Sequence, residues 1–127
     1  MKKLLIVFLA IPLPVFGYEK HELHGIWSMI PLNNGIANVV TLDKDGVSKH
    51  YTVQCTNKNG HFTISEPDIG KYKILNNLLV ITDGDGNPVT ELKVISVGNG
   101  GMKLGQEYFT LEYRKAKEVK PLCDMYR

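Results

Sequence analysis

The sequence predicts an all-β fold, a small antiparallel barrel or sandwich of about eight or nine short strands. Short runs of apolar and β-branched residues alternate with polar residues, which is the period of two of half-buried strands. Turns rich in Gly, Asn and Asp separate these runs, and no segment keeps the periodicity of a helix. A chain of 127 residues is expected to form one domain.

The first seventeen residues have the layout of a secretory signal peptide. A short positive start at Lys2 and Lys3 precedes an apolar run, and the segment ends in the small residue Gly17. Pro12 and Pro14 interrupt the run well before the roughly 20 residues that a membrane-spanning helix needs. We therefore expect a signal peptide over residues 1–17, a mature domain over residues 18–127, and no membrane span.

Each expected strand is bounded by a turn or a proline. The clearest one, residues 47–55, alternates Tyr51, Val53 and Cys55 with polar neighbours, and the Asp45-Gly46 turn before it predicts a hairpin with the preceding run. Residues 66–70 are expected to form a loop. In chain order the expected strands are residues 23–30, 36–42, 47–55, 61–65, 71–75, 78–82, 89–97, 102–104 and 108–114.

Charge and cysteine content limit the partners and the compartment. Without Lys2 and Lys3, the fifteen basic residues become thirteen, which balance thirteen acidic ones. Because the lysines are scattered rather than gathered into a basic patch, we expect no nucleic-acid partner. Cys55 and Cys123 are the only cysteines; in an exported chain they are expected to form a disulfide, and two free thiols are the alternative.

The segment Gly25-Ile26-Trp27 resembles the Gly-x-Trp element of the calycins, which include the lipocalins, fatty-acid-binding proteins and avidins. The resemblance implies an up-and-down barrel of about eight strands in which Trp27 closes one end. It also implies that an arginine of the last strand, here Arg114, packs across the indole as a cation–π partner. Gly25, Trp27 and Arg114 are thus expected to be structural residues.

The order of the remaining motifs is similar to small bacterial lipocalin-like domains of unknown function. A Gly70-x-Tyr72-x-Ile74 strand is followed by a Leu79-x-Ile81 strand, and both follow an Asp-x-Asp-Gly hairpin. The resemblance spans the mature chain and implies a periplasmic or secreted bacterial protein, which we expect to be a monomer.

No pattern in the sequence predicts catalysis, a metal or a cofactor. Residues 83–87 begin like a calcium loop, but Pro88 and Val94 stand where that loop needs Gly and Glu. His21 and His24 lie three apart before a strand, where that spacing places side chains on opposite faces. No serine lies in a nucleophile elbow. We expect no enzyme, no metal site and no cofactor.

Two functions from different classes remain. One is a carrier that binds a small hydrophobic ligand inside the barrel, and the other is a protein-interaction module, such as an inhibitor or immunity protein, with a filled interior. An interior void of a few hundred Å3 would favour the carrier. Its expected lining is Trp27, Met29, Val40, Tyr51, Val53, Tyr72, Ile81, Leu92, Phe109 and Leu111.

Overall fold

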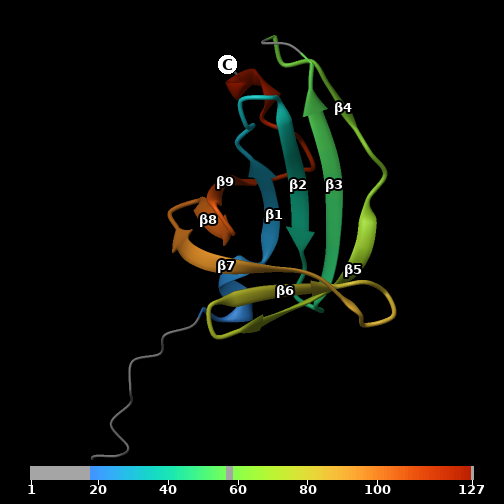
Figure 1. Cartoon of the computed structure of the whole chain (residues 1–127), viewed down its shortest axis with the longest axis vertical. Helices are drawn as coiled ribbons and strands as arrows, with labels where there is room; N and C mark the ends of the chain where they lie inside the picture. Colours follow the sequence, from blue (N-terminus) through green and yellow to red (C-terminus); the bar gives the residue numbers. More distant parts are fainter. Residues whose placement is uncertain (1–17, 57–58, 127) are drawn as a thin grey trace, which may run out of the picture.

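The computed structural model of the chain describes residues 18–56 and 59–126 (Figure 1). The expected signal peptide, residues 1–17, lies outside the described residues. The described residues form the strands β1 (Gly25–Met29), β2 (Ile36–Leu42), β3 (Val47–Cys55), β4 (Phe62–Ile64), β5 (Asp68–Leu75), β6 (Leu78–Thr82), β7 (Pro88–Gly98), β8 (Gly101–Gln106) and β9 (Phe109–Ala116), with the short 3-10 helices η1 (Lys20–Leu23) and η2 (Cys123–Met125).

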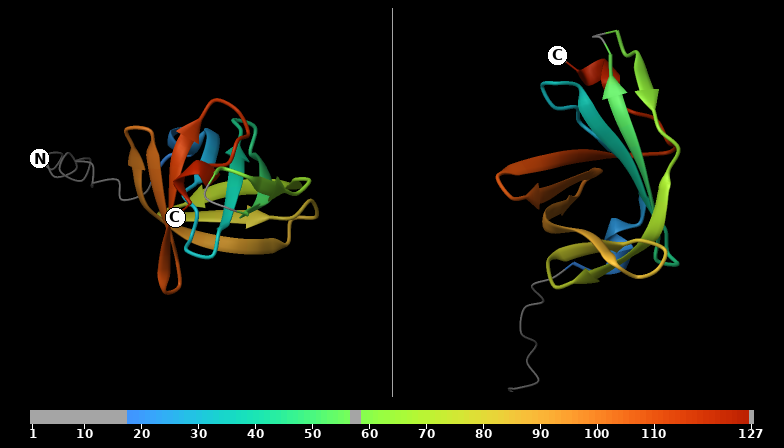
Figure 2. Two further views of the ribbon diagram at one scale, coloured as in Figure 1. Left: turned by 90° about the horizontal axis from the view of Figure 1, so that it is seen from above. Right: turned by 45° about the vertical axis from the view of Figure 1, so that its right-hand side comes forward.

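Eight strands close into an antiparallel up-and-down barrel, as the sequence predicts. Apart from β4, each strand pairs with the next one along the chain, and β9 returns to pair with β1. The extra strand β4 pairs with the last part of β3, whereas β5 pairs with its first part. β1, β2 and β3 run side by side, and β6 and β7 run across their lower ends in the view of Figure 1, so strands on opposite sides of the barrel cross steeply (Figure 2).

The hairpin of β2 and β3 illustrates why these residues form these elements. The two strands pair over the whole of β2, from Ile36 opposite Gln54 to Leu42 opposite Ser48. In the turn between them, Asp43 Oδ1 accepts hydrogen bonds from the backbone N–H groups of Asp45 and Val47, each at 2.9 Å. An Asp side chain that bonds its own backbone two residues on is a strong turn former.

Several strand boundaries differ from the sequence prediction, by one to three residues. Leu23 lies in η1 and not in the first strand, which begins at Gly25. The expected loop of residues 66–70 already belongs to β5 from Asp68 onward, because Asp68 to Gly70 pair with β3. Gly70 allows this path, since a Cβ atom there would collide with the carbonyl of Thr82.

The strand registers define an inner and an outer face of the barrel wall. Trp27 lies opposite Val40, Val40 opposite His50, and His50 opposite Asp68, so these four residues form one row across β1, β2, β3 and β5 on the inner face. Ser28, Val39 and Tyr51 form the neighbouring row. Side chains alternate along a strand, so this second row lies on the outer face.

The C-terminal segment covers part of this outer face and makes a second buried layer. The disulfide between Cys55 and Cys123 confirms the pairing predicted from the sequence and ties the segment to β3. Ser28 Oγ donates a hydrogen bond of 2.6 Å to the backbone oxygen of Lys120. Val39 and Val53 are almost completely buried although they point away from the barrel interior.

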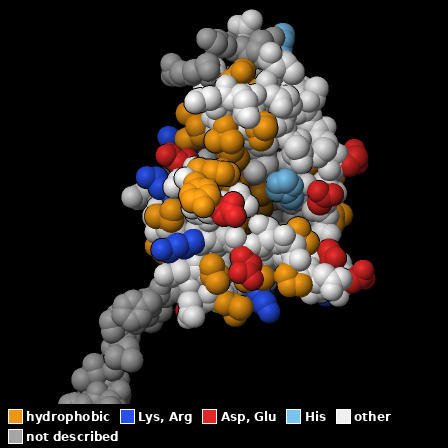
Figure 3. All heavy atoms as spheres, in the orientation of Figure 1, with side chains coloured by type: hydrophobic (Ala, Val, Ile, Leu, Met, Phe, Trp, Pro, Cys, Tyr) orange, Lys and Arg blue, Asp and Glu red, His pale blue; other side chains and the backbone are white. Residues whose placement is uncertain are grey.

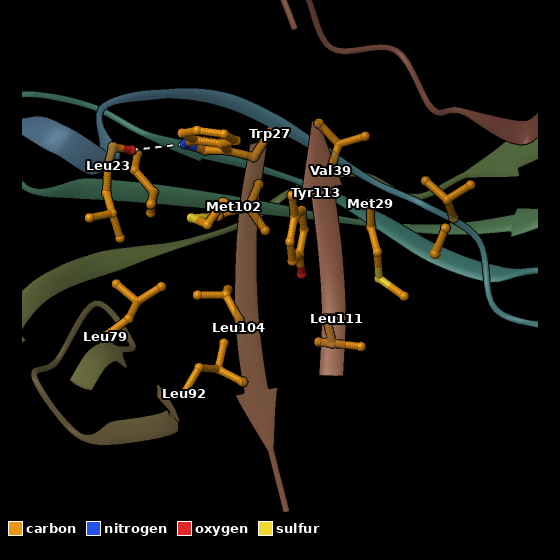
Figure 4. Packing of buried hydrophobic residues seen from close by; sticks show 14 of the residues in the cluster. Leu23, Trp27, Met29, Val39, Leu79, Leu92, Met102, Leu104, Leu111 and Tyr113 are labelled. Carbon is orange, nitrogen blue, oxygen red and sulfur yellow. Dashed lines mark hydrogen bonds between the residues drawn. The ribbon is translucent and has the colours of Figure 1, made fainter. Parts of the chain in front are cut away.

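Trp27 closes the end of the barrel next to η1 (Figure 4). The ring is buried, and its Nε1 donates a hydrogen bond of 2.9 Å to the carbonyl of Leu23, which is itself fully buried. A buried indole N–H normally finds such a partner. This hydrogen bond ties the Trp27 ring to the segment that precedes β1.

The cation over this indole belongs to Lys115 and not to Arg114. Lys115 Nζ lies 5.4 Å from the centre of the Trp27 ring, and the two residues are opposite each other in the register of β1 and β9. Arg114 lies opposite Ser28, on the outer face, and is exposed. The prediction that Arg114 packs on the indole is therefore wrong. The next residue, Lys115, makes the contact, because neighbouring residues of a strand lie on opposite faces.

Candidate ligand cavity

A cavity of about 520 Å3 lies in the barrel interior, and its lining does not include Trp27 or Leu23. Ligand sites in proteins commonly have volumes of roughly 300–1,000 Å3. On the face shown in Figure 3, hydrophobic side chains gather around a hollow, with acidic side chains and a histidine beside it. The cavity is lined by Asn38, Val40, Ser48, His50, Asp68, Ile69, Gly70, Leu79, Ile81, Thr82, Asp83, Val89, Thr90, Leu92, Met102, Leu104, Gln106, Leu111 and Tyr113.

One wall of the cavity is apolar and comes from β6, β7, β8 and β9. In the view of Figure 4, the side chains of Leu79, Leu92 and Leu104 lie below Met102, and Leu111 lies beside them below Tyr113. Cross-strand pairing explains the cluster, because Leu79 lies opposite Leu92 and Leu104 lies opposite Leu111. All four leucines are buried. This wall offers hydrocarbon surface to a ligand.

The opposite wall, from β2, β3 and β5, carries polar side chains. Asn38, His50 and Asp68, which we call the polar stripe, all line the cavity. His50 and Asp68 are directly opposite in the register, and Asn38 lies opposite Thr52, two residues along β3 from His50. Diagonal neighbours on one face of a sheet have Cα atoms about 7–8 Å apart. Buried Ser48 adds a hydroxyl to the same wall.

Burial keeps the imidazole of His50 neutral around pH 7. Desolvation lowers the pKa of His50 from its usual value, and the nearby carboxylate of Asp68 opposes this shift without cancelling it. A neutral imidazole can donate one hydrogen bond and accept one. His50 therefore contributes polarity to the stripe without contributing positive charge.

Asn38 presents an unpaired acceptor. Its Oδ1 is buried and has no hydrogen-bond partner among the described residues. Its Nδ2 donates to Met29 Sδ at 3.4 Å. Native proteins pair the large majority of buried polar atoms, so this unpaired acceptor is an exception, and it belongs to a residue that lines the cavity.

The charged groups of the cavity are acidic. Among the described residues that line it, Asp68 and Asp83 carry carboxylates and none is a lysine or arginine. Asp83 also holds the turn after β6: its Oδ1 accepts hydrogen bonds from the backbone N–H groups of Asp85 and Asn87, at 2.9 and 3.0 Å. The Asn87 hydrogen bond is the main reason that the pKa of Asp83 lies below its usual value.

The structure distributes the expected lining residues over four places. Val40, Ile81, Leu92 and Leu111 line the cavity. The other six do not: Trp27, Met29 and Tyr72 are buried in the core, Phe109 is half exposed, and Tyr51 and Val53 lie on the outer face. Val53 lies beneath the C-terminal segment, because that segment supplies a second apolar neighbour for β3.

The polar stripe was not expected from the sequence as part of a site. His50 reads as an exposed residue on the polar face of its strand, and Asp68 lies in what reads as a loop. Period-two alternation separates two faces but does not say which one turns inward. The sequence did contain one signal for a polar wall: Asn38 and His50 alternate with apolar residues on two consecutive predicted strands.

The sequence also raised the question of a metal site, at the histidines or at residues 83–87. Within residues 18–56 and 59–126, no three His, Cys, Asp or Glu side chains are grouped as they would be around a metal ion. Residues 83–87 form the turn described above. Nor does the described part of the chain contain a helix with the length and apolar character needed to cross a membrane.

Comparisons with known proteins return nothing similar: no protein-family model, no curated protein and no solved structure matches the chain.

Proposed function

We propose that this chain is an exported, lipocalin-like barrel that binds a small, largely apolar ligand in its interior and performs no chemistry on it. The cavity of about 520 Å3 between an apolar wall and a polar one is the observation that carries this proposal. About eight strands enclose an interior that side chains either fill or leave open for one small ligand. The alternative, an interaction module, was expected to have an interior filled by side chains, without such a void.

Two further observations support the proposal. The Cys55–Cys123 disulfide suits an oxidising compartment outside the cytosol, in line with the signal-like segment at the N-terminus. Ile69 and Val89 line the cavity and are also 60% and 64% exposed, so apolar side chains continue from the cavity to the surface. An apolar molecule entering from water would meet these side chains first.

A cavity-filling substitution tests the proposal. An environment-sensitive apolar dye should bind the native chain with one saturable site, and Leu104→Phe, which places a larger ring in the void, should weaken this binding at least several-fold. Ile95→Phe is the matched control, since Ile95 lies on the neighbouring strand and is exposed outside the cavity. Circular dichroism melting of both variants checks that they fold. Equal dye binding by both folded variants would exclude the cavity as the site.

A further inference from the structure

We infer that the ligand of this cavity is an apolar amine, whose cationic, hydrogen-bond-donating end lies at the polar stripe of Asn38, His50 and Asp68 and whose hydrocarbon part lies against the leucines of β6 to β9. The inference rests on the proposed function and adds the chemical class of the ligand. It depends on three features of the cavity: the sign of its charge, an unpaired acceptor, and the separation of its polar wall from its apolar wall.

The charge of the cavity disfavours an anion and favours a cation. Both charged residues in the described lining, Asp68 and Asp83, are carboxylates. An alkyl carboxylate would bring a third negative charge into a partly enclosed space with no cation to balance it, and unpaired charges in such places are costly. An ammonium group at the polar stripe would instead meet the opposite charge of Asp68.

The basic side chains are held elsewhere in the structure. Lys49 and Lys71 are exposed and lie at strand positions that alternate with the inward-facing residues of β3 and β5. Lys115 and Lys20 are at the closed end, where their Nζ atoms lie 5.4 Å from the Trp27 ring centre and 5.1 Å from the Tyr72 ring centre. The described cavity wall thus has no cation to pair with a carboxylate ligand.

The unpaired Oδ1 of Asn38 favours a ligand that carries a hydrogen-bond donor. This oxygen is buried in the wall and accepts nothing from the described residues. A buried acceptor left unsatisfied is costly, and a ligand N–H that pairs with it recovers that cost. A carboxylate has no donor to offer, an alcohol has one, and a primary ammonium has three.

The position of the polar stripe sets the orientation of the ligand. Asn38, His50 and Asp68 lie on β2, β3 and β5, whereas Leu79, Leu92, Leu104 and Leu111 lie on β6 to β9. Asp68 is exposed, so the stripe runs from buried Asn38 Oδ1 toward solvent. An amine at the stripe keeps one side in contact with water while its alkyl chain is buried.

Three ligands that share one alkyl chain test the inference: n-decylamine, n-decanol and n-decanoic acid, titrated calorimetrically near neutral pH below their micelle concentrations. We expect the amine to bind at least roughly tenfold more tightly than the acid, which corresponds to about 1.4 kcal/mol, with the alcohol between them. Asp68→Asn should reduce the preference for amine over acid several-fold. Asn38→Leu should weaken the amine and the alcohol and leave the acid unchanged.

Asp45→Asn is the matched control, because it makes the same change of charge at an exposed turn residue outside the cavity lining. If the acid binds as tightly as the amine, or if Asp45→Asn acts as strongly as Asp68→Asn, the inference is wrong while the carrier function stands. If none of the three decyl compounds binds, the carrier function is wrong as well.

Discussion

Lys115 lies across the indole of Trp27, and Gly25 leaves the space for it. Lys115 Nζ is 5.4 Å from the ring centre, and a Cβ atom at Gly25 would come within 2.6 Å of Lys115 Cε. Gly25 also has φ +136°, a backbone conformation that other residues rarely adopt. Gly25 and Trp27 thus act on the same contact: Trp27 supplies the ring, and Gly25 leaves room for the lysine side chain that lies over it.

Removing this cation should weaken the closed end. Lys115→Met keeps an apolar stem over the ring but loses the charge, so we expect a loss of about 0.5–2 kcal/mol in the free energy of unfolding. Arg114→Met is the control, because Arg114 is exposed on the outer face, and its effect should stay within about 0.5 kcal/mol. Urea unfolding of both variants measures this. Equal losses would show that the lysine has no special role.

Trp27 itself should matter more than its cation. Trp27→Ala removes a side chain that is 2% exposed and should cost about 3–5 kcal/mol. Trp27→Phe keeps most of the apolar bulk but leaves the buried carbonyl of Leu23 without its donor, so its cost should be smaller, about 1–3 kcal/mol. Thermal melting followed by circular dichroism ranks the variants. An unchanged melting temperature for Trp27→Ala would contradict a closing role.

Local sequence signals were sufficient for the strands and the hairpin of β2 and β3, whereas the closed barrel was predicted from the resemblance. The Asp43 turn and the period-two run after it have strong local causes, and the observed β2 and β3 have the expected bounds, residues 36–42 and 47–55. Gly25 and Trp27 identify the closed end because close approach and aromatic bulk are properties of single residues. The Cys55–Cys123 pair followed from the presence of only two cysteines.

The direction of each face could not be predicted from local pattern. Val53 alternates correctly along β3 but points outward, because the C-terminal segment gives the outer face its own apolar cover through Cys123. The choice between Arg114 and Lys115 depends on the register of β9 against β1, in which a shift of one residue exchanges the faces. For the same reason, residues such as His50 and Asp68 join the cavity only through pairing between distant strands.

The disulfide should supply a large share of the stability of the chain. It joins residues 68 positions apart, and the chain-entropy model gives about 4 kcal/mol for a loop of this size. Replacing Cys55 and Cys123 together by alanine should lower the free energy of unfolding by about that amount and release the C-terminal segment from β3. Denaturant unfolding measures the loss, and limited proteolysis after Ala116 reports the released segment. A segment that stays protected would mean that the Ser28 contact and packing hold it unaided.

Stability should fall at alkaline pH as the buried phenol of Tyr113 ionises. Burial raises its pKa from 10.0 to about 12, with a hydrogen bond from Asn38 partly opposing the shift. The folded state therefore favours the neutral phenol. Its contribution is complete below about pH 10 and is lost as the pH rises through about 12, amounting to about 2–3 kcal/mol.

Urea unfolding across this range, together with the absorbance of tyrosinate, checks the effect of Tyr113. Tyr72, whose pKa burial also raises to about 12, should contribute to the same decline. Tyr113→Phe removes one of the two phenols while keeping the ring, so its stability should fall less steeply above about pH 10 than that of the native chain. Tyr108→Phe is the control, because Tyr108 is 96% exposed and should leave the slope unchanged. Identical slopes for native chain and Tyr113→Phe would mean that the Tyr113 phenol ionises without opposing the fold.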